Sequence, residues 1–346
     1  MSASLLDYET AAPLRALTES FPYTDLCPDG DDLHDDQFAR DLRTVADADM
    51  LECREVSAPG DDYVRHATLY DVAIGGARML IERTRAPIGP HRQNLVFFPG
   101  LSEHITHSTV RKFHDQLSSH FPEADVTTIG SNGIGVRGHD TSTRHERNQQ
   151  RLDLLLATAA RQAVTTVGTS MGSQESNDLA QLNDDEGRPL VIEGQVYFAS
   201  ALVESCRTWR TMGSRFTPRL TYDLGRMLLR QPVNRWPEQA SALAAWLKQA
   251  VIEVPSEAHQ IGHLLEGTPE AQLDSVADQG FPILILNGLK DVVCEEKGMR
   301  RLARNHSNVR FVAIPKRGHD LPFEADKPAD KLSREMQISG MLTPSL

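Results

Sequence analysis

The chain has 346 residues, of which 40% are hydrophobic and 24% are charged, and its formal net charge is −12 at pH 7. A chain of this length and composition can bury a substantial core, as a large soluble enzyme domain does. The net acidity argues against nucleic acid or an anionic membrane as the main partner.

The first part of the chain, residues 1–63, is polar, and the stretch from Asp25 to Asp62 is dense in Asp and Glu. We interpret this part as a solvated N-terminal extension, with one helix expected near Gln37 to Asp49. The core of the fold is therefore expected to begin at residue 64.

Strands and helices then alternate along the chain. The predicted strands cover residues 68–74, 77–83, 94–98, 125–129, 163–167, 190–199, 282–286 and 309–314. Gly75-Gly76 separates the first two strands and predicts a hairpin with a two-residue turn. Helices with apolar residues along one face are expected at 110–121, at 152–159 and from Met171 onward. This alternation requires an α/β fold with a mostly parallel central sheet and helices on both faces.

The segment Gly168-Thr169-Ser170-Met171-Gly172 has the pattern G-x-S-x-G between a predicted strand and a predicted helix. In that context the pattern is typical of a nucleophile elbow, a sharp turn that exposes a serine hydroxyl. Glycines are needed because a side chain at either position would crowd the reversing chain. The turn also points the backbone N–H of Met171 and the start of the helix toward an oxyanion formed at Ser170.

Two later loops supply the other residues that a serine nucleophile requires. Asp291 closely follows the strand at 282–286, and His319 closely follows the strand at 309–314. The chain order Ser170, Asp291, His319 accompanies the nucleophile elbow and differs from the order in chymotrypsin-like and subtilisin-like enzymes. We predict these three residues as a catalytic triad, with Glu204 as the alternative position for the acid.

On these motifs the chain resembles the α/β-hydrolase fold superfamily, from about Val64 to its C-terminus. The resemblance implies that the loop after the strand at 94–98 supplies a second oxyanion donor, here the backbone N–H of Leu101. Gly100 allows the close approach that this hole needs. Gly100, Ser102 and His104 are therefore expected to contact the substrate.

Residues 202–279 interrupt the alternation and contain all three tryptophans of the chain. We interpret this segment as a helical lid inserted between two parts of the hydrolase core, residues 64–201 and 280–346. Trp209, Met212 and Phe216 are expected to line an acyl pocket. The alternative is a set of amphipathic helices whose apolar faces simply pack on the body.

Two further motifs match, in part, the patterns of a nucleotide site and of a metal site. Gly133 to Gly138 matches the dinucleotide pattern G-x-G-x-x-G, but residues 139–147 lack helical apolar spacing, so no nucleotide site is expected. The pair His104-x-x-His107 lacks a third ligand, so no metal site is expected. The predicted chemistry needs no cofactor and no metal.

The four cysteines, at positions 27, 53, 206 and 294, show neither metal spacing nor a disulfide framework. The N-terminus carries Asp7 and Glu9 and predicts no secretory signal, and no apolar run approaches the roughly 18 residues that cross a bilayer. We therefore expect a cytoplasmic protein that acts on a small acyl substrate away from membranes, and we leave its oligomeric state open.

Together these patterns predict a serine hydrolase that cleaves a carboxylic ester or thioester with an apolar acyl group through an acyl-enzyme on Ser170. One alternative is an acyltransferase, or a lactone-forming or lactone-hydrolysing enzyme of secondary metabolism. Another is a non-hydrolytic binding or cyclisation scaffold that retains the triad as a relic. The fold by itself does not decide among these functions.

Overall fold

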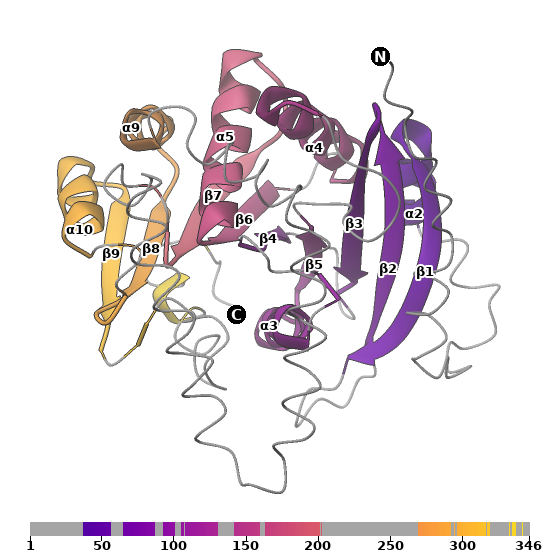
Figure 1. Cartoon of the computed structure of the whole chain (residues 1–346), viewed down its shortest axis with the longest axis horizontal. Coiled ribbons are helices and arrows are strands. Elements are labelled where there is room, and N and C mark those ends of the chain that lie inside the picture. The colour runs from indigo at the N-terminus through magenta and orange to yellow at the C-terminus, as the bar shows by residue number, and fades with distance from the viewer. Residues whose placement is uncertain are drawn as a thin grey trace, which may run out of the picture.

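The computed structural model describes residues 37–56, 65–86, 93–100, 105–106, 108–130, 142–159, 163–200, 202, 269–291, 294, 296–315, 317–318, 332, 334–336 and 341. Within these residues, nine strands form one sheet in the order β1-β2-β3-β5-β4-β6-β7-β8-β9 (Figure 1). The strands are β1 (Asp47–Val56), β2 (Arg65–Ile74), β3 (Ala77–Thr84), β4 (Gln93–Phe98), β5 (Ala124–Ile129), β6 (Ala163–Thr169), β7 (Ile192–Phe198), β8 (Ile283–Gly288) and β9 (Val309–Ile314).

The sheet has an antiparallel part and a longer parallel part. β1, β2 and β3 pair antiparallel, and β3 pairs antiparallel with β5. The six strands from β5 to β9 in the sheet order all pair parallel. The predicted α/β class with a mostly parallel sheet is therefore confirmed. The glycine hairpin is confirmed as well, since Gly75 and Gly76 have φ values of 54° and 89° and join β2 to β3.

Helices cover both faces of the sheet. The described helices are α2 (Gln37–Val45), α3 (Ser108–His120), α4 (Arg144–Thr158), α5 (Met171–Asp185), α9 (Pro269–Asp278) and α10 (Glu296–Asn305). Side chains of β4 show how the two faces divide. Val96 and Phe98 share a core with α2, α4 and α5, whereas Leu95 and Phe97 share a core with α3. Figure 1 shows α3 on one side of the sheet and α4 and α5 on the other.

The expectation of a polar extension over residues 1–63 is wrong for residues 37–56. Phe38 and Leu42 of α2 are buried in the core that α4 also lines, and β1 is the first strand of the sheet. The helix ends at Val45, not near Asp49. β1 escapes prediction because an edge strand has one half-exposed face and a charged sequence, which leaves little apolar alternation to detect.

The predicted lid also needs correction at its C-terminal end. Pro269–Asp278 forms α9, and Leu273 and Val276 of this helix pack in one core with Ile283 and Ile285 of β8. This part of the segment therefore packs on the body of the molecule, as the alternative interpretation expected. Trp209, Met212 and Phe216 lie outside the described residues, and the other domain boundaries stay predictions.

A third difference concerns the start of α4. Residues 139–147 were expected to be non-helical, yet the helix begins at Arg144. Thr143 and Glu146 form a capping box, in which the Thr143 side chain accepts from the Glu146 N–H and the Glu146 side chain accepts from the Thr143 N–H. A polar first turn can therefore begin a helix without apolar spacing. The glycine motif at 133–138 lies outside the described residues.

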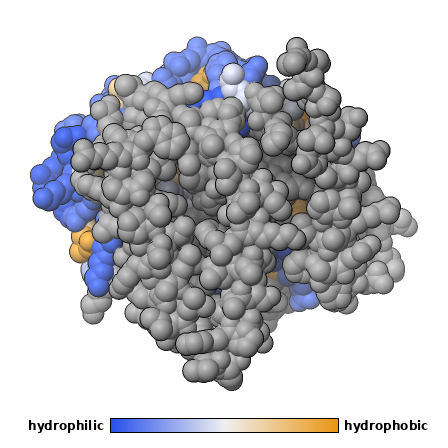
Figure 2. Space-filling view, in the orientation of Figure 1, coloured by the Kyte–Doolittle hydropathy of each residue, from blue (hydrophilic) through white to orange (hydrophobic). Residues whose placement is uncertain are grey.

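The described part of the surface is largely polar. In the view of Figure 2, the described residues that reach the surface are mostly hydrophilic. Exposed large hydrophobic residues within the described ranges are scattered along the chain, at Val45, Met50, Val191 and Leu289. None of the described helices is both long enough and apolar enough to span a bilayer.

Candidate active site

Ser170 sits on the turn between β6 and α5, with backbone angles of φ 48° and ψ −113°. A non-glycine residue with positive φ is strained and persists only where its surroundings fix it. Here the Ser170 N–H donates to the carbonyl of Phe198, 2.8 Å away at the end of β7, and the Ser173 N–H donates to the carbonyl of Ser170 at 3.2 Å. The turn is thus held from the neighbouring strand and from its own helix.

Both glycines of the motif are required by close backbone contacts. A Cβ atom on Gly168 would lie 2.5 Å from the backbone N of Ser173, and one on Gly172 would lie 2.0 Å from the carbonyl oxygen of Phe98. Backbone atoms cannot move aside as a flexible side chain can. The first turn of α5 therefore lies directly against the end of β4 and against the carbonyl of Pro99 that follows it.

Met171 is the first residue of α5 and is only 4% exposed. The N-terminus of a helix carries partial positive charge and backbone N–H groups that have no partner within the helix. A negatively charged oxygen bound at Ser170 would lie next to this end of α5. The geometry suits the oxyanion role expected for the Met171 N–H.

Asp291 follows β8 and is buried, at 8% relative exposure. Its backbone N–H donates to the carbonyl of Gly288 at 3.0 Å, which closes a tight turn directly after the strand. Its Oδ1 accepts a hydrogen bond of 2.8 Å from the backbone N–H of Cys294. One carboxylate oxygen is therefore fixed by the loop itself.

The loop that leads to His319 lies against the loop that carries Asp291. A Cβ atom on Gly288 would lie 2.4 Å from the carbonyl oxygen of Arg317 and 2.6 Å from that of Gly318. Only glycine permits this approach, so the segment Gly288 to Asp291 and the residue before His319 are neighbours. His319 itself is outside the described residues.

The structure thus brings Ser170 and Met171 to the carboxyl end of β6 and Asp291 to the carboxyl end of β8, with β7 between them. Gly100, which follows β4 in the chain, is buried. The predicted site residues outside the described part of the chain are Leu101, Ser102, His104, Trp209, Met212, Phe216 and His319. The alternative acid Glu204 also lies outside it.

A polar layer, which the sequence did not reveal, lies beneath α5. Ser176 lies within hydrogen-bond distance of the Thr166 hydroxyl of β6, and Gln195 of β7 donates to the Ser176 carbonyl at 2.8 Å. Burial raises the pKa of Tyr197 well above its ordinary value. These side chains join the helix that begins at Met171 to two strands. The available signal was the presence of Thr, Gln and Tyr at buried strand positions, which need hydrogen-bond partners.

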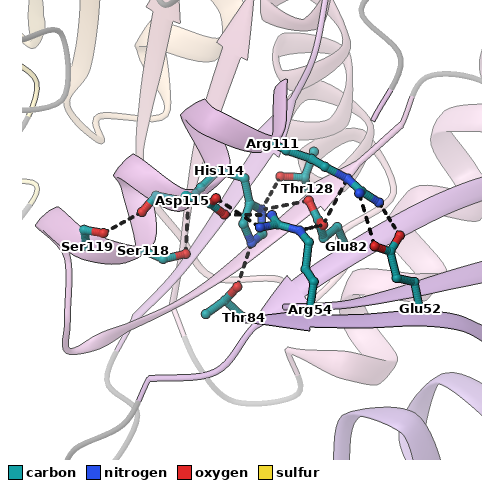
Figure 3. A network of polar contacts seen from close by, with 10 residues as sticks. All are labelled: Glu52, Arg54, Glu82, Thr84, Arg111, His114, Asp115, Ser118, Ser119 and Thr128. Carbon is teal, nitrogen blue, oxygen red and sulfur yellow. Dashed lines mark hydrogen bonds and ion pairs between the residues drawn. The ribbon is translucent and has the colours of Figure 1, made fainter. Parts of the chain in front are cut away.

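A second missed network lies between α3 and the antiparallel strands (Figure 3). Arg54 of β1 donates to Glu82 of β3 at 2.8 Å and to both carboxylate oxygens of Asp115 on α3. The imidazole of His114, fully buried, bonds to the hydroxyls of Thr84 and Thr128 at 2.8 and 2.7 Å. α3 is thus tied to β1, β3 and β5 by its polar face.

The buried charges of this network shift each other's titration. Burial lowers the pKa of His114, so the ring is neutral at pH 7. Burial alone would raise the pKa of Glu82, but the charged guanidinium groups of Arg54 and Arg111 lower it overall. Within the described ranges, no three His, Cys, Asp or Glu side chains converge as metal ligands. The network joins α3 to the antiparallel strands by ion pairs and hydrogen bonds.

A parallel sheet whose central strand β6 ends in a strained serine turn and leads into a helix defines an α/β-hydrolase fold. The family model described as serine aminopeptidase, S33, matches residues 89–326, and the chain belongs to this family.

Three solved structures illustrate the likeness of the fold. Est1E from Butyrivibrio proteoclasticus has 12% sequence identity and a TM-score of 0.51, over 79% of this chain and 99% of that one. The enol-lactonase from Burkholderia xenovorans LB400 has 14% identity and a TM-score of 0.53, over 79% and 100%. A soluble variant of monoglyceride lipase from Saccharomyces cerevisiae has 14% identity and a TM-score of 0.52, over 80% and 95%. No curated protein matches the sequence.

Proposed function

We propose that this chain is a serine hydrolase that cleaves a carboxylic ester or thioester with an apolar acyl group, through an acyl-enzyme on Ser170. The observation that carries the proposal is the backbone of Ser170, held at φ 48° between β6 and α5. Such strain persists where the surrounding structure over-determines it, and it clusters at functional sites. The family to which the chain belongs supports hydrolysis as the reaction class.

In the proposed mechanism, His319 accepts the Ser170 proton as the hydroxyl oxygen attacks the acyl carbonyl carbon. The leaving alcohol or thiol takes that proton back from His319 as the acyl-enzyme forms. Water, activated by the same imidazole, then releases the acid. Asp291 holds the imidazole in the required tautomer and stabilises the imidazolium, with its Oδ1 already bound by the Cys294 N–H.

The negative charge that develops on the carbonyl oxygen is assigned to the backbone N–H groups of Met171 and Leu101. Each such donor lowers the barrier by about 3 kcal/mol. Support for the first donor is its place at the N-terminus of α5. Support for the second is the close approach of Gly172 to the carbonyls of Phe98 and Pro99, which shortly precede Leu101 in the chain.

The ester or thioester class rests on less specific support. An enol-lactonase and a monoglyceride lipase share the fold, whereas the family description names an aminopeptidase. A substrate panel should therefore contain p-nitrophenyl esters, acyl thioesters, lactones and aminoacyl p-nitroanilides. Faster turnover of the anilides than of every ester would replace the ester assignment with a peptidase one. Transfer of the acyl group to an added alcohol or amine in preference to water would indicate the acyltransferase alternative.

The test of the nucleophile is covalent labelling by a fluorophosphonate probe, located by peptide mass spectrometry. We expect labelling at Ser170 in the wild type, and neither labelling nor esterase activity in Ser170→Ala. Ser173→Ala is the matched control, because Ser173 is buried one turn away and donates to the Gly168 carbonyl at 3.0 Å. Failure of the probe and of the whole substrate panel on folded protein would favour a non-hydrolytic scaffold.

A further inference from the structure

Asn287 is a polar residue at the end of an otherwise apolar strand, Ile283–Gly288. Its side chain is fully buried, with 0% relative exposure, and it directly precedes the turn from Gly288 to Asp291. Burying an amide without hydrogen bonds is costly, so such a residue is expected where its polar group has a specific partner.

The partner of this amide is a backbone group of the loop that carries Asp291. Nδ2 of Asn287 donates to the carbonyl oxygen of Cys294 at 3.0 Å. The N–H of the same residue, Cys294, donates to Oδ1 of Asp291 at 2.8 Å. Asn287 and Asp291 therefore hold the two polar backbone groups of one residue. Within the described structure, Oδ1 of Asn287 accepts no hydrogen bond, so the side chain acts through its Nδ2 donor.

Cys294 is also fixed by its side chain. The thiol is fully buried in the core that contains Met171, the first residue of α5, and Met299 of α10. The loop after β8 therefore shares a core with the start of the helix that follows Ser170. A shift of the Cys294 backbone would therefore move the Asp291 carboxylate relative to the nucleophile turn.

We propose that Asn287 is a positioning residue for the acid of the triad, acting on Asp291 through the backbone of Cys294. The inference rests on the proposed function and deepens it. The Cys294 N–H holds Oδ1 and so sets the orientation of the carboxylate, and the proposed function assigns the other oxygen to His319. Loss of the Asn287 amide frees the Cys294 carbonyl and lets the carboxylate rotate, so the imidazolium is less well stabilised in the transition state.

The first variant is Asn287→Leu, which keeps the approximate shape of the side chain and removes the donor. Asn183→Leu is the matched control. Asn183 is also buried, donates to the Leu190 carbonyl at 3.1 Å and accepts from the Leu190 N–H at 3.2 Å, but it joins the end of α5 to the segment before β7. The comparison separates the effect of losing any buried amide hydrogen bond from the effect of losing the bond between Asn287 and Cys294.

For Asn287→Leu we expect kcat on a p-nitrophenyl ester to fall about tenfold, with KM within about twofold of wild type. The acid limb of the kcat/KM profile should shift to lower pH, because a poorly placed carboxylate raises the pKa of His319 less. Asn183→Leu should lower the melting temperature without moving kcat or the pH profile. Equal kcat and equal pH profiles in both variants would overturn the inference.

Asn287→Asp is the second variant, to be used if Asn287→Leu does not fold, because Asp and Asn have nearly the same side-chain volume. The new carboxyl can donate to the Cys294 carbonyl only when protonated, so its kcat relative to wild type should rise as the pH falls. A flat ratio across the accessible pH range would contradict the positioning role. Ser170→Ala in the same assay tests the proposed function separately from the role of Asn287. Full activity in Ser170→Ala would contradict the proposed function. An inactive Ser170→Ala together with normal activity in Asn287→Leu would contradict only the positioning role of Asn287.

Discussion

The backbone N–H of Lys290 donates a hydrogen bond to the carbonyl oxygen of Arg317, 2.8 Å away. Lys290 precedes Asp291, and Arg317 lies two residues before His319. The bond thus joins two loops that are separated by α10 and β9 in the chain, and it lies beside the close contact at Gly288. A backbone bond of this kind holds the two loops together without using their side chains.

Asp291→Asn should lower kcat for ester hydrolysis by roughly 10³ to 10⁴ while leaving the fold intact, because the amide favours the wrong tautomer of His319. The fold is expected to survive since an amide oxygen can still accept from the Cys294 N–H, as Oδ1 does now. Steady-state kinetics and circular dichroism test both parts. Glu204→Gln is the companion variant, and a larger loss there would move the acid to the loop after β7.

Gly172→Ala should disrupt the elbow, because its Cβ would lie 2.0 Å from the Phe98 carbonyl oxygen and 2.6 Å from that of Pro99. α5 must then move away from β4, at a cost of about 1–3 kcal/mol of stability. A displacement near 1 Å at Ser170 lowers activity about 10²-fold. Denaturant unfolding and kcat measure the two effects.

Gly194→Ala is the control for that substitution. Its Cβ would meet the Met341 side chain at 3.0 Å, which can adjust, and the Pro282 carbonyl oxygen at 3.3 Å. We expect activity to remain close to wild type. An equal loss of activity in both variants would mean that the contact with β4 has no special bearing on Ser170.

The sequence predicted the parallel half of the fold well for a physical reason. Strands buried on both faces are continuous apolar runs, as in Ile283–Gly288, and they stand out from their polar connections. β1 did not stand out, because its outer residues are exposed or half-exposed and polar. α9 was assigned to the lid because its apolar residues suit either packing on the body or a cover over the site, and only tertiary contact distinguishes the two.

At the candidate site, the sequence indicated the loops but not how they are held. The pattern around Ser170 predicts a strand, a turn and a helix, and these are present. The hydrogen bond from Cys294 to Asp291 uses a backbone N–H, so the residue type at position 294 does not predict it. The pairing of Arg54 with Glu82 and Asp115 depends on the register of β1 with β2, which includes a bulge between Met50 and Glu52. Such register cannot be derived from a strand that the pattern does not reveal.

The His114 network predicts a loss of stability on acidification. Burial lowers the pKa of His114 in the folded state, so below its ordinary value of 6.5 the unfolded chain binds the proton first. The free energy of unfolding then falls with decreasing pH, by up to about 1.4 kcal/mol per pH unit for this group. Glu82 does not offset the loss, because its own pKa is lowered from 4.5 and it stays ionised in this window.

His114→Gln should therefore reduce the slope of the free energy of unfolding against pH below about pH 6.5. Glutamine can still bond to the hydroxyls of Thr84 and Thr128 but does not titrate. Urea unfolding at a series of pH values gives the slope, and His145→Gln, at an exposed position of α4, is the control. Unchanged slopes in His114→Gln would mean that other groups dominate acid unfolding.

The acyl specificity is expected to reflect the apolar residues of the predicted lid, among them Trp209, Met212 and Phe216. Each methylene that leaves water contributes about 0.8 kcal/mol, which is about a fourfold gain in kcat/KM if it is fully expressed in the transition state. Activity on p-nitrophenyl esters should rise from acetyl to at least hexanoyl, and Trp209→Ala should flatten that rise more than it lowers the acetyl rate. A profile that peaks at acetyl and falls steeply would mean that the segment closes a small site. The function would then be that of a short-chain or dedicated small-molecule hydrolase, with Ser170 in the same role.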